Sequence, residues 1–573
     1  MHSVDENMQP EKRKKTAFFL LASVLIASCM VAGLIAATAN DIGWTCDEVY
    51  YFESSDLIIT WTQALVKSFF RGNPRAILSA SITDQYWLWD ISHNPHPPLY
   101  KIFSAITLVL FRPYLGDFAA YRFSSALLCA VLLLTLFFVL YKRYGLAAGV
   151  CGCLSLLFMP RFFGHAHIAA TEIPLTTFWF LACCAFWKGL DRRAGIILLG
   201  VLWGCAIATK FTGLLLPAPL IAWVLLYKER RGLGTVAIAL PIALLLALLV
   251  NPGWWHDPIG KIIHFVQISL SRENTIRIPT FFLGKTYSFS PPLTYAWVMT
   301  AITVPVTTLF TFTLGLLCLY RDTANRRFNT LMFINCLFPP VLTMLPNAPV
   351  HDGTRQFFYM FPFMAYFSGA GFYILAEQLK AVMKIKKILI PAALGICILY
   401  PAYQTLRIHP YELCYFNELV GGVRGAYSLG METTYWYDVV TDKFIEELNR
   451  EIPRGAAVSM WVANQSYFEF LQNRGKIRKD IKFITPDIAV TITSKGAAFK
   501  FTPDTPQYLI LLSRQGTFNE LYWNIYYKNR PLYSLQLEGI PLISIYRWKD
   551  IKFIIKSPTQ SAQGYFSSYE VNS

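Results

Sequence analysis

The segment AFFLLASVLIASCMVAGLIA at residues 17–36, followed closely by DIGWTCDEVYYF at residues 41–52, decides the fold. The first segment carries no charge and has the length of about 20 residues that an α-helix needs to cross a membrane. Four basic residues at 12–15 precede it, which predicts an N-terminus on the cytoplasmic side. Because its apolar core exceeds the ~7–15 residues typical of a signal peptide, we expect an uncleaved first span. The second segment then lies just outside the membrane and carries two adjacent carboxylates, Asp47 and Glu48.

The composition indicates a polytopic membrane protein. Of the 573 residues, 54% are hydrophobic and the mean hydropathy is +0.40, above the ~45–50% apolar content of soluble chains. The net charge of +16 could suggest nucleic acid, but the basic residues sit in short clusters between apolar runs. That pattern is typical of membrane topology and suits anionic lipid head groups. The sequence also contains no Walker P-loop and no G-x-G-x-x-G after a strand, so no soluble nucleotide is predicted as a ligand.

The second apolar run, at residues 98–111, decides the topology. It is short for a membrane span, and the preceding residues 40–97 are polar and aromatic, so we expect these outside. If 98–111 spans the membrane, the later basic clusters lie outside; if it lies along the surface, every cluster lies inside. The positive-inside rule favours the surface segment. Ten further spans are then expected near residues 119–140, 146–160, 172–188, 195–209, 212–227, 235–250, 293–318, 329–346, 357–377 and 387–404.

This count predicts a chain with eleven spans and an outer C-terminus. We expect a cytoplasmic N-terminus at 1–15, an all-α membrane domain at 16–404 with a first outer loop at 40–118, and an extracytoplasmic domain at 405–556. A polar tail at 557–573 is expected to be disordered. The extracytoplasmic domain is predicted to be α/β, with strands at 456–462, 481–485, 508–512 and 541–548 and helices at 466–473 and 517–528.

The twelve cysteines show no metal-type spacing, and ten of them fall in apolar runs. There they are most simply small hydrophobic residues. Cys46 and Cys414 lie in polar segments and could form a disulfide if the outer side is oxidising. The sequence leaves this pairing open, because it does not show whether the two residues are close.

Asp47 and Glu48 are the first candidates for chemistry. They either mark the end of a span or supply a base, because a carboxylate near an apolar surface has a raised pKa. Tyr50 and Tyr51 follow directly. Their rings could form a wall on which a sugar stacks, or part of the aromatic belt at a membrane interface.

Three basic side chains in other outer segments could contact a phosphate. His96 lies in the proline-rich turn 93–101, Lys210 separates two short apolar runs, and Arg355 opens a later span. The guanidinium fork of Arg355 matches phosphate oxygens. The simpler alternatives are an unremarkable turn for His96 and a lysine at the membrane interface for Lys210.

Glu172 opens a span from the outer face and is a candidate second acid. The alternative is a carboxylate that stabilises a helix N-terminus. His165 and His167, just before it, form a lone H-x-H pair, which is weak evidence for a metal. Six of these acids and cations come from five different outer segments, and beside apolar helices they suit an ionic ligand with a lipid tail. They are Asp47, Glu48, His96, Glu172, Lys210 and Arg355.

At these positions the sequence resembles the polytopic glycosyltransferases of the GT-C fold. Within them it is similar to the dolichyl-phosphate-mannose protein mannosyltransferases and the aminoarabinose lipid A transferases. The resemblance covers roughly residues 15–440, and the order and sidedness of its motifs are more specific than any single motif. The matching features are Asp47-Glu48, His96-Pro97-Pro98, Glu172-x-Pro174, Lys210, Arg355, and the segment 409–422 with Tyr435-Trp436.

The resemblance implies an inverting glycosyltransferase in the cytoplasmic membrane, which uses a polyprenyl-phosphate-linked sugar on the outer face. Asp47 would be the general base for the acceptor, Glu48 and Glu172 would position substrates, and Lys210 and Arg355 would hold the leaving phosphate. His96 stands near a position where aminoarabinose transferases have a lysine. No D-x-D motif, as in metal-dependent oligosaccharyltransferases, is visible in the first outer loop, so no metal or other cofactor is expected.

Two other functions remain open. A transporter or flippase of polyprenyl-linked glycans would need ionisable residues near mid-span, and the predicted spans contain almost none. An envelope-glycan polymerase or ligase would also use outer arginines, without needing Asp47, Glu48 and Glu172 together. The acceptor could be a lipid such as lipid A, a glycan or a protein, and the sequence does not identify it or the sugar. Membrane lipid is an expected partner and nucleic acid is not.

Overall fold

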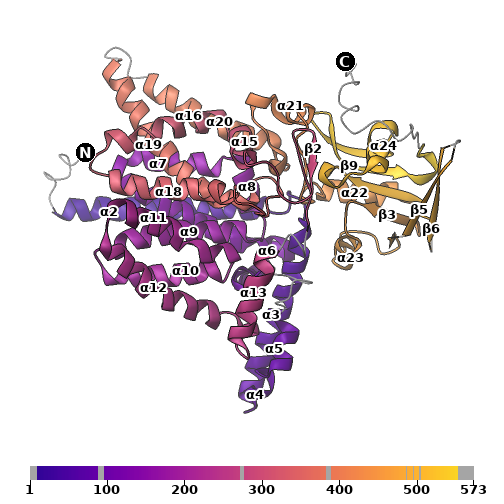
Figure 1. Ribbon diagram of the computed structural model, residues 1–573, viewed down its shortest axis with the longest axis horizontal. Coiled ribbons are helices and arrows are strands. Elements are labelled where there is room, and N and C mark those ends of the chain that lie inside the picture. The colour runs from indigo at the N-terminus through magenta and orange to yellow at the C-terminus, as the bar shows by residue number, and fades with distance from the viewer. Residues whose placement is uncertain are drawn as a thin grey trace.

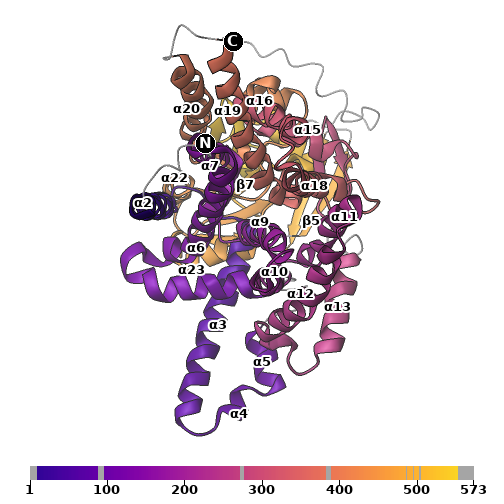
Figure 2. The same cartoon turned by 90° about the vertical axis from the view of Figure 1, so that its left-hand side faces the viewer.

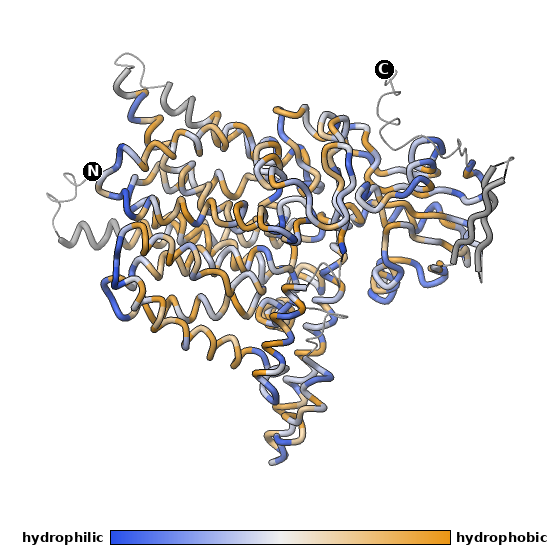
Figure 3. Tube along the Cα trace, in the orientation of Figure 1, coloured by the Kyte–Doolittle hydropathy of each residue, from blue (hydrophilic) through white to orange (hydrophobic). Residues whose placement is uncertain are grey.

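The computed structural model describes residues 10–87, 96–271, 277–382, 389–485, 487–493, 496–502 and 505–552. The predicted tail at 557–573 and residues 93–95 of the proline-rich turn lie outside this part of the chain. A helical bundle occupies one side of the molecule and a smaller sheet-containing domain the other (Figure 1). Apolar residues dominate the bundle helices, whereas the sheet-containing domain alternates apolar and polar residues (Figure 3).

The bundle consists of helices that are apolar around most of their surface, as expected for segments that contact lipid and each other. Their packing buries a continuous core that includes Trp179, Trp223 and Tyr366. The helices are α2 (Pro10–Ala37), α6 (Leu99–Tyr144), α7 (Leu146–Leu157), α8 (Pro160–Ala166), α9 (Glu172–Gly189), α10 (Arg193–Ile207), η1 (Phe211–Leu215), α11 (Pro217–Tyr227), α12 (Arg230–Leu249), α15 (Tyr295–Thr303), α16 (Val306–Gly315), α17 (Cys318–Arg321), α18 (Arg326–Leu342), η3 (Arg355–Met360), α19 (Phe361–Val382) and α20 (Leu389–Ile408).

Helix α6 joins the predicted surface segment to the predicted second span. Its backbone turns a corner at Gly116, where φ is 75° and ψ is 173°. That combination is open almost only to glycine, because no Cβ clashes there. The corner separates residues 99–115 from residues 117–144, so the two predicted segments are distinct helices that follow one another without a loop.

The number of spans stays a prediction. By length and composition, four of the described helices could cross a membrane, or up to six if each bent pair counts as one span. The two bent pairs are α7 with α8 and α15 with the helix beginning at Val306. Shorter apolar helices lie at Arg193–Ile207 and Phe211–Tyr227. The eleven predicted spans therefore include several segments shorter than a usual span.

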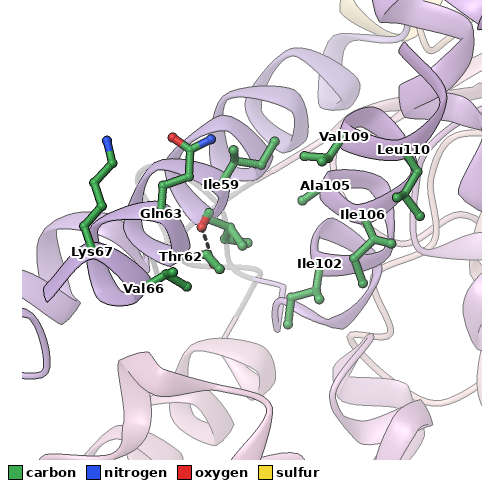
Figure 4. Close-up of a pocket in the computed structure, with 11 residues that line it drawn as sticks. Ile59, Thr62, Gln63, Val66, Lys67, Ile102, Ala105, Ile106, Val109 and Leu110 are labelled. Carbon is green, nitrogen blue, oxygen red and sulfur yellow. Dashed lines mark hydrogen bonds between the residues drawn. The ribbon is translucent and has the colours of Figure 1, made fainter. Parts of the chain in front are cut away.

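An arm of helices projects beyond the bundle, next to the end that faces the sheet-containing domain (Figures 1 and 2). An apolar groove of about 610 Å³ lies between its first helix and the start of α6. Figure 4 shows Ile59 and Val66 on one wall of this groove and Ile106 and Leu110 on the other. The arm consists of α3 (Cys46–Phe70), α4 (Pro74–Ile77), α5 (Ala80–Tyr86), η2 (Pro252–Trp254) and α13 (Pro258–Leu270), and the short hairpin β1 (Thr280–Phe282) and β2 (Lys285–Tyr287) follows it.

The C-terminal part of the chain folds around a five-stranded sheet with the order β4-β3-β7-β9-β8. Strand β3 pairs in parallel with β4 and β7, whereas β9 is antiparallel to β7 and β8. The elements are η4 (Glu412–Cys414), η5 (Glu418–Val420), α21 (Gly422–Ser428), α22 (Asp442–Glu451), β3 (Ala457–Trp461), α23 (Gln465–Asn473), β4 (Lys482–Ile484), β5 (Asp487–Thr493), β6 (Gly496–Thr502), β7 (Tyr508–Leu512), η6 (Gln515–Thr517), α24 (Glu520–Lys528), β8 (Tyr533–Leu537), β9 (Ile540–Arg547) and η7 (Trp548–Asp550).

Each predicted strand coincides with an observed one, and both predicted helices are present as α23 and α24. Strand β8, helix α22 and the antiparallel hairpin β5–β6 were not predicted. The domain boundaries and the outer location of this part stay predictions.

The start of α3 packs against the C-terminal domain. The ring of Trp44 lies 4.0 Å from that of Phe118 and 6.2 Å from that of Phe470, as measured between centroids. Tyr467 donates a hydrogen bond of 2.7 Å to the carbonyl of Trp44. Arg474 forms an ion pair of 2.5 Å with Asp56. These contacts fix the segment that carries Asp47 between the bundle and the C-terminal domain.

Candidate active site

Arg355 is the centre of a cluster of three carboxylates. Its Nη2 lies 2.7 Å from Asp47, its Nη1 lies 2.8 Å from Asp352, and its Nε lies 3.3 Å from Glu172. The guanidinium also stacks on Trp436, with 3.6 Å from Cζ to the ring. Residues from four separate parts of the chain thus meet at one planar cation, whose fork geometry suits several carboxylates at once.

Lys210 joins this cluster through Glu172, with 3.6 Å between Nζ and Oε1. Glu172 is the first residue of α9, where the helix macrodipole favours a negative charge. Lys210 lies in extended backbone between α10 and η1, which breaks the helix and turns the side chain inward. The structure therefore brings together Asp47, Glu172, Lys210 and Arg355.

Asp47 differs from the other acids of the cluster in exposure. Its side chain is 31% exposed, compared with 1% for Glu172 and 3% for Asp352. Its Oδ2 is held by Arg355, whereas among the described residues Oδ1 accepts a weak S–H bond of 3.6 Å from Cys46. Asp47 thus has an oxygen that an incoming hydroxyl group can reach, which a general base needs.

Asp352 links the cluster to the C-terminal domain. Arg514, just after β7, lies 2.6 Å from its Oδ1, and His351 lies 3.0 Å from its Oδ2. Burial alone would raise the pKa of the Asp352 carboxyl, but Arg514, His351 and Arg355 hold this pKa well below its usual range. Its φ of 57° is uncommon for a residue other than glycine, and such strain concentrates at functional sites.

Glu48 does not share the environment of Asp47. It is fully buried and forms a two-pronged ion pair with Arg122, with distances of 2.8 Å and 2.7 Å. It also accepts hydrogen bonds from the backbone N–H groups of Thr45 and Ala169, each at 3.0 Å. Both oxygens are occupied by the chain itself, so this geometry favours a structural role for Glu48 over the predicted catalytic one. The sequence carried a signal for it, because Thr45-x-x-Glu48 is a capping box.

The remaining predicted binding residues lie around the cluster. Tyr50 accepts a hydrogen bond of 3.0 Å from Asn464 of the C-terminal domain. Tyr51 is buried edge-on against Tyr100, with 4.8 Å between ring centroids. His96 lies farther out, with its ring 6.4 Å from that of Tyr51. The structure thus places the ring of His96 next to Tyr51.

The two histidines of the H-x-H pair have different surroundings. His167 is fully buried and its ring nitrogens lie 2.7 Å from the carbonyl of Phe163 and 2.8 Å from Thr38. These contacts join α8 to the end of α2. His165 packs between Phe358 and Trp436, with centroid distances of 4.5 Å and 5.4 Å. Among the described residues, no group of three or more His, Cys, Asp or Glu is arranged to hold a metal ion.

Cys46 and Cys414 are both free thiols, so the disulfide that the sequence left open is not formed. Sequence reasoning also assigned no role to Asp352, Arg122, Arg161 or Arg514. Arg122 had a signal, since an arginine in an otherwise apolar span usually has a partner inside the protein. Arg514 had none, because only the tertiary fold brings the end of β7 against residue 352.

One family model matches part of this chain. Residues 95–256 match the family described as dolichyl-phosphate-mannose-protein mannosyltransferase. The match indicates a glycosyltransferase and confirms the resemblance over this stretch, which contains His96, Glu172 and Lys210. It begins after Asp47 and ends before Arg355.

No curated protein matches the chain. Among solved structures, apo ArnT from Cupriavidus metallidurans is 13% identical with a TM-score of 0.48, over 91% of this chain and 98% of that chain. The same protein bound to undecaprenyl phosphate is 12% identical with a TM-score of 0.46, over 91% and 97%. Archaeal oligosaccharyltransferase AglB from Archaeoglobus fulgidus, in complex with an inhibitory peptide and a dolichol-phosphate, is 11% identical with a TM-score of 0.43, over 89% and 71%. Likenesses this distant assign no residue a role.

Proposed function

We propose that this protein is an inverting glycosyltransferase that moves a sugar from a polyprenyl-phosphate donor to an acceptor on the outer face of the cytoplasmic membrane. The observation that carries the proposal is the meeting of Asp47, Glu172, Lys210 and Arg355 between the bundle and the C-terminal domain. The family description names a dolichyl-phosphate-linked sugar as donor, which is a member of this donor class.

Asp47 is the group best placed to start the reaction. Its open oxygen takes the proton of an acceptor hydroxyl, and the resulting oxygen nucleophile attacks the anomeric carbon of the donor sugar. The new C–O bond forms on the face opposite the bond to phosphate, which breaks with its electron pair on the phosphate oxygen. A positioned base contributes about 10²–10⁴-fold to such a step.

The two cations act on the leaving phosphate. A phosphate leaves as a stable anion and needs no proton from a general acid, so fixed positive charge is sufficient to stabilise it. Lys210 and Arg355 carry that charge, and Glu172 holds both in position through one carboxylate oxygen. Because these cations already contact carboxylates, the donor phosphate has to share them with Glu172 and Asp47.

The acceptor is expected to approach from the C-terminal domain. Asp47 is the exposed member of the cluster, and neighbouring Tyr50 contacts Asn464 of that domain. An envelope glycan, a lipid such as lipid A, or a protein would each supply a hydroxyl group there. The acceptor, the sugar and the outer location all remain parts of the proposal.

The experiment measures release of polyprenyl phosphate from a panel of polyprenyl-phosphate sugars by membranes that contain the protein, with membrane extract as the acceptor source. Asp47→Asn keeps the shape and removes the base, so we expect release to fall about 10²–10⁴-fold while donor binding persists. Asp56→Asn, on the same helix and paired with Arg474, is the matched control and is expected to retain activity. Equal release by wild type and Asp47→Asn would remove Asp47 from the mechanism.

A further inference from the structure

Arg161 is a buried arginine that lacks a carboxylate partner in the described part of the chain. Its side chain lies in α8 and the residue is 1% exposed. Its Nε donates a hydrogen bond of 3.2 Å to the carbonyl of Tyr415. Its Nη1 and Nη2 have no hydrogen-bond partner among the residues that the structure describes. An arginine stays charged in proteins, so this guanidinium is a buried positive charge that makes no ion pair within the described residues. The buried carboxyl of Asp438 is near enough for the charge of Arg161 to lower its pKa, but neither of its oxygens is hydrogen-bonded to the guanidinium.

The fold holds this guanidinium in a defined place. Its Cζ lies 4.9 Å from the ring of Phe416 and 5.8 Å from that of Tyr435. Gly353, with a φ of 63°, passes so close that a Cβ there would lie 2.6 Å from Nη1 of Arg161 and 2.8 Å from the ring of Tyr435. Aromatic faces offset part of the charge, but they leave the N–H groups of Nη1 and Nη2 without acceptors.

Other side chains around Arg161 also carry buried polar atoms without partners. They are both ring nitrogens of His165, Oγ1 of Thr354, the hydroxyl of Tyr435 and Nε1 of Trp436. Buried polar atoms are rarely left unpaired in proteins, so such a group calls for a water or a ligand. Arginine and tryptophan N–H groups only donate, whereas hydroxyl and imidazole groups can adapt. The set therefore fits a ligand rich in acceptor oxygens.

The charge balance of the neighbourhood points to an anion. Arg355, Lys210 and Arg514 each contact a carboxylate of the catalytic cluster, which has as many acids as bases. Arg161 adds a positive charge to this balance. The buried carboxyl of Asp438 offsets this charge only in part, because burial raises the pKa of Asp438 to about 7 and keeps much of it protonated at neutral pH. Its cluster is continuous with the catalytic one, because Trp436 stacks on Arg355 at 3.6 Å and lies 5.4 Å from His165.

We propose that Arg161, with His165, Thr354, Tyr435 and Trp436, binds the phosphate group of a lipid-linked substrate or product. The lipid part of this ligand depends on the proposed function. The binding of its phosphate group depends only on the unpaired donors. The site lies beside Arg355 and so can receive the phosphate that Arg355 and Lys210 help to release.

The test measures binding of undecaprenyl phosphate, undecaprenol and inorganic phosphate to the purified full chain, by equilibrium titration and by the shift in thermal midpoint. Wild type is expected to bind undecaprenyl phosphate and not undecaprenol. Arg161→Gln should weaken that binding about 10- to 100-fold, the loss expected when hydrogen bonds to a charged group are removed. Tyr435→Phe, which deletes one hydroxyl, should weaken it about 3- to 10-fold.

A second readout separates binding from a structural role. Because Arg161→Gln removes a buried charge that has no partner, the thermal midpoint of the ligand-free protein should stay the same or rise. Arg161→Lys keeps the charge without the fork and should bind with intermediate affinity. Arg450→Gln, with an arginine side chain that is 67% exposed on α22, is the charge-matched control and should bind like wild type.

Each outcome decides the proposal. Undiminished binding in both Arg161→Gln and Tyr435→Phe would overturn it, and so would a lower ligand-free midpoint with binding retained. If Arg161→Gln does not fold, Arg161→Lys and Tyr435→Phe decide by the same criterion. Binding of inorganic phosphate alone, dependent on Arg161, supports the site but removes the lipid-linked donor from the proposed function. Normal binding by Arg161 variants that have lost transfer would leave the proposed function standing without this site.

Discussion

Two buried arginines, Arg122 and Arg161, are about equally shielded from solvent and have opposite surroundings. Arg122 donates to both oxygens of Glu48 and to the carbonyls of Ala39, Ile42 and Gly43, at 2.6–2.9 Å. Within the described residues, Arg161 has one hydrogen bond, from Nε. Burial alone therefore does not show what an arginine does. A guanidinium with every donor paired stabilises the fold, whereas one with unpaired donors can still bind a ligand.

The largest effect on stability is expected at Arg122, whose hydrogen-bond donors are paired. Arg122→Gln leaves the buried Glu48 carboxylate without its counterion and frees three backbone carbonyls. Breaking a buried pair in this way costs about 3–5 kcal/mol, so we expect a large fall in thermal midpoint. The measurement compares the midpoints of Arg122→Gln and Arg161→Gln in the same detergent. A fall of similar size in both would end the distinction between the two arginines.

The double variant Glu48→Gln with Arg122→Gln sharpens the comparison. If the two side chains act as one structural unit, the double variant should be less destabilised than the sum of the two single variants. Additive losses would mean that Glu48 acts independently of Arg122. That outcome would reopen the predicted role of Glu48 in catalysis.

The next largest effect on stability is expected at Asp438, a buried carboxyl near Arg161. Among the described residues, neither of its oxygens has a hydrogen-bond partner. Burial raises its pKa to about 7. The folded state therefore binds a proton that the unfolded chain, with a pKa near 4, has already lost over this range. Wild type should lose stability as the pH rises from about 4 to 7 and change little above that.

Asp438→Asn removes this titration. The variant should match wild type near pH 4 and exceed it by about 4 kcal/mol near pH 8, measured as thermal midpoints across that range. Arg161 lowers the pKa of Asp438 by its charge, so the difference should grow when Arg161→Gln is added. A wild-type advantage at pH 8 would mean that ionised Asp438 forms a stabilising ion pair with Arg161, which would count against the phosphate site.

The two arginines also show which features of the fold and the site can be predicted from the sequence. Hydrophobic runs and turn residues located the bundle helices, and short apolar runs located strands β3, β4, β7 and β9. Those signals are local, since each depends on residues a few positions apart. Asp47, Glu172, Lys210 and Arg355 were found because their chemistry and their expected side of the membrane agreed. The structure adds the contacts that join them.

The missed residues depend on contacts between distant segments. Arg514 reaches Asp352 across 162 positions of the chain, and Glu48 reaches Arg122 across 74. Local pattern does not predict such pairs, because the side chains come together only when the C-terminal domain and α6 pack against α3. The sequence placed Glu48 beside Asp47, and we expected both to act on substrates, Asp47 as the general base and Glu48 by positioning a substrate. The fold turns one carboxylate into the core and leaves the other partly exposed.

The smallest effect is expected at a third arginine, which is exposed. Arg112 and Asp117 form an ion pair of 2.6 Å across the corner of α6 at Gly116, with side chains 64% and 31% exposed. Water and salt screen such a pair, and exposed pairs contribute about 0–1 kcal/mol. Arg112→Gln should therefore shift the thermal midpoint only slightly, and still less at high salt. A loss as large as that of Arg122→Gln would mean that the pair holds the corner and that exposure is a poor guide to the role of an arginine in this protein.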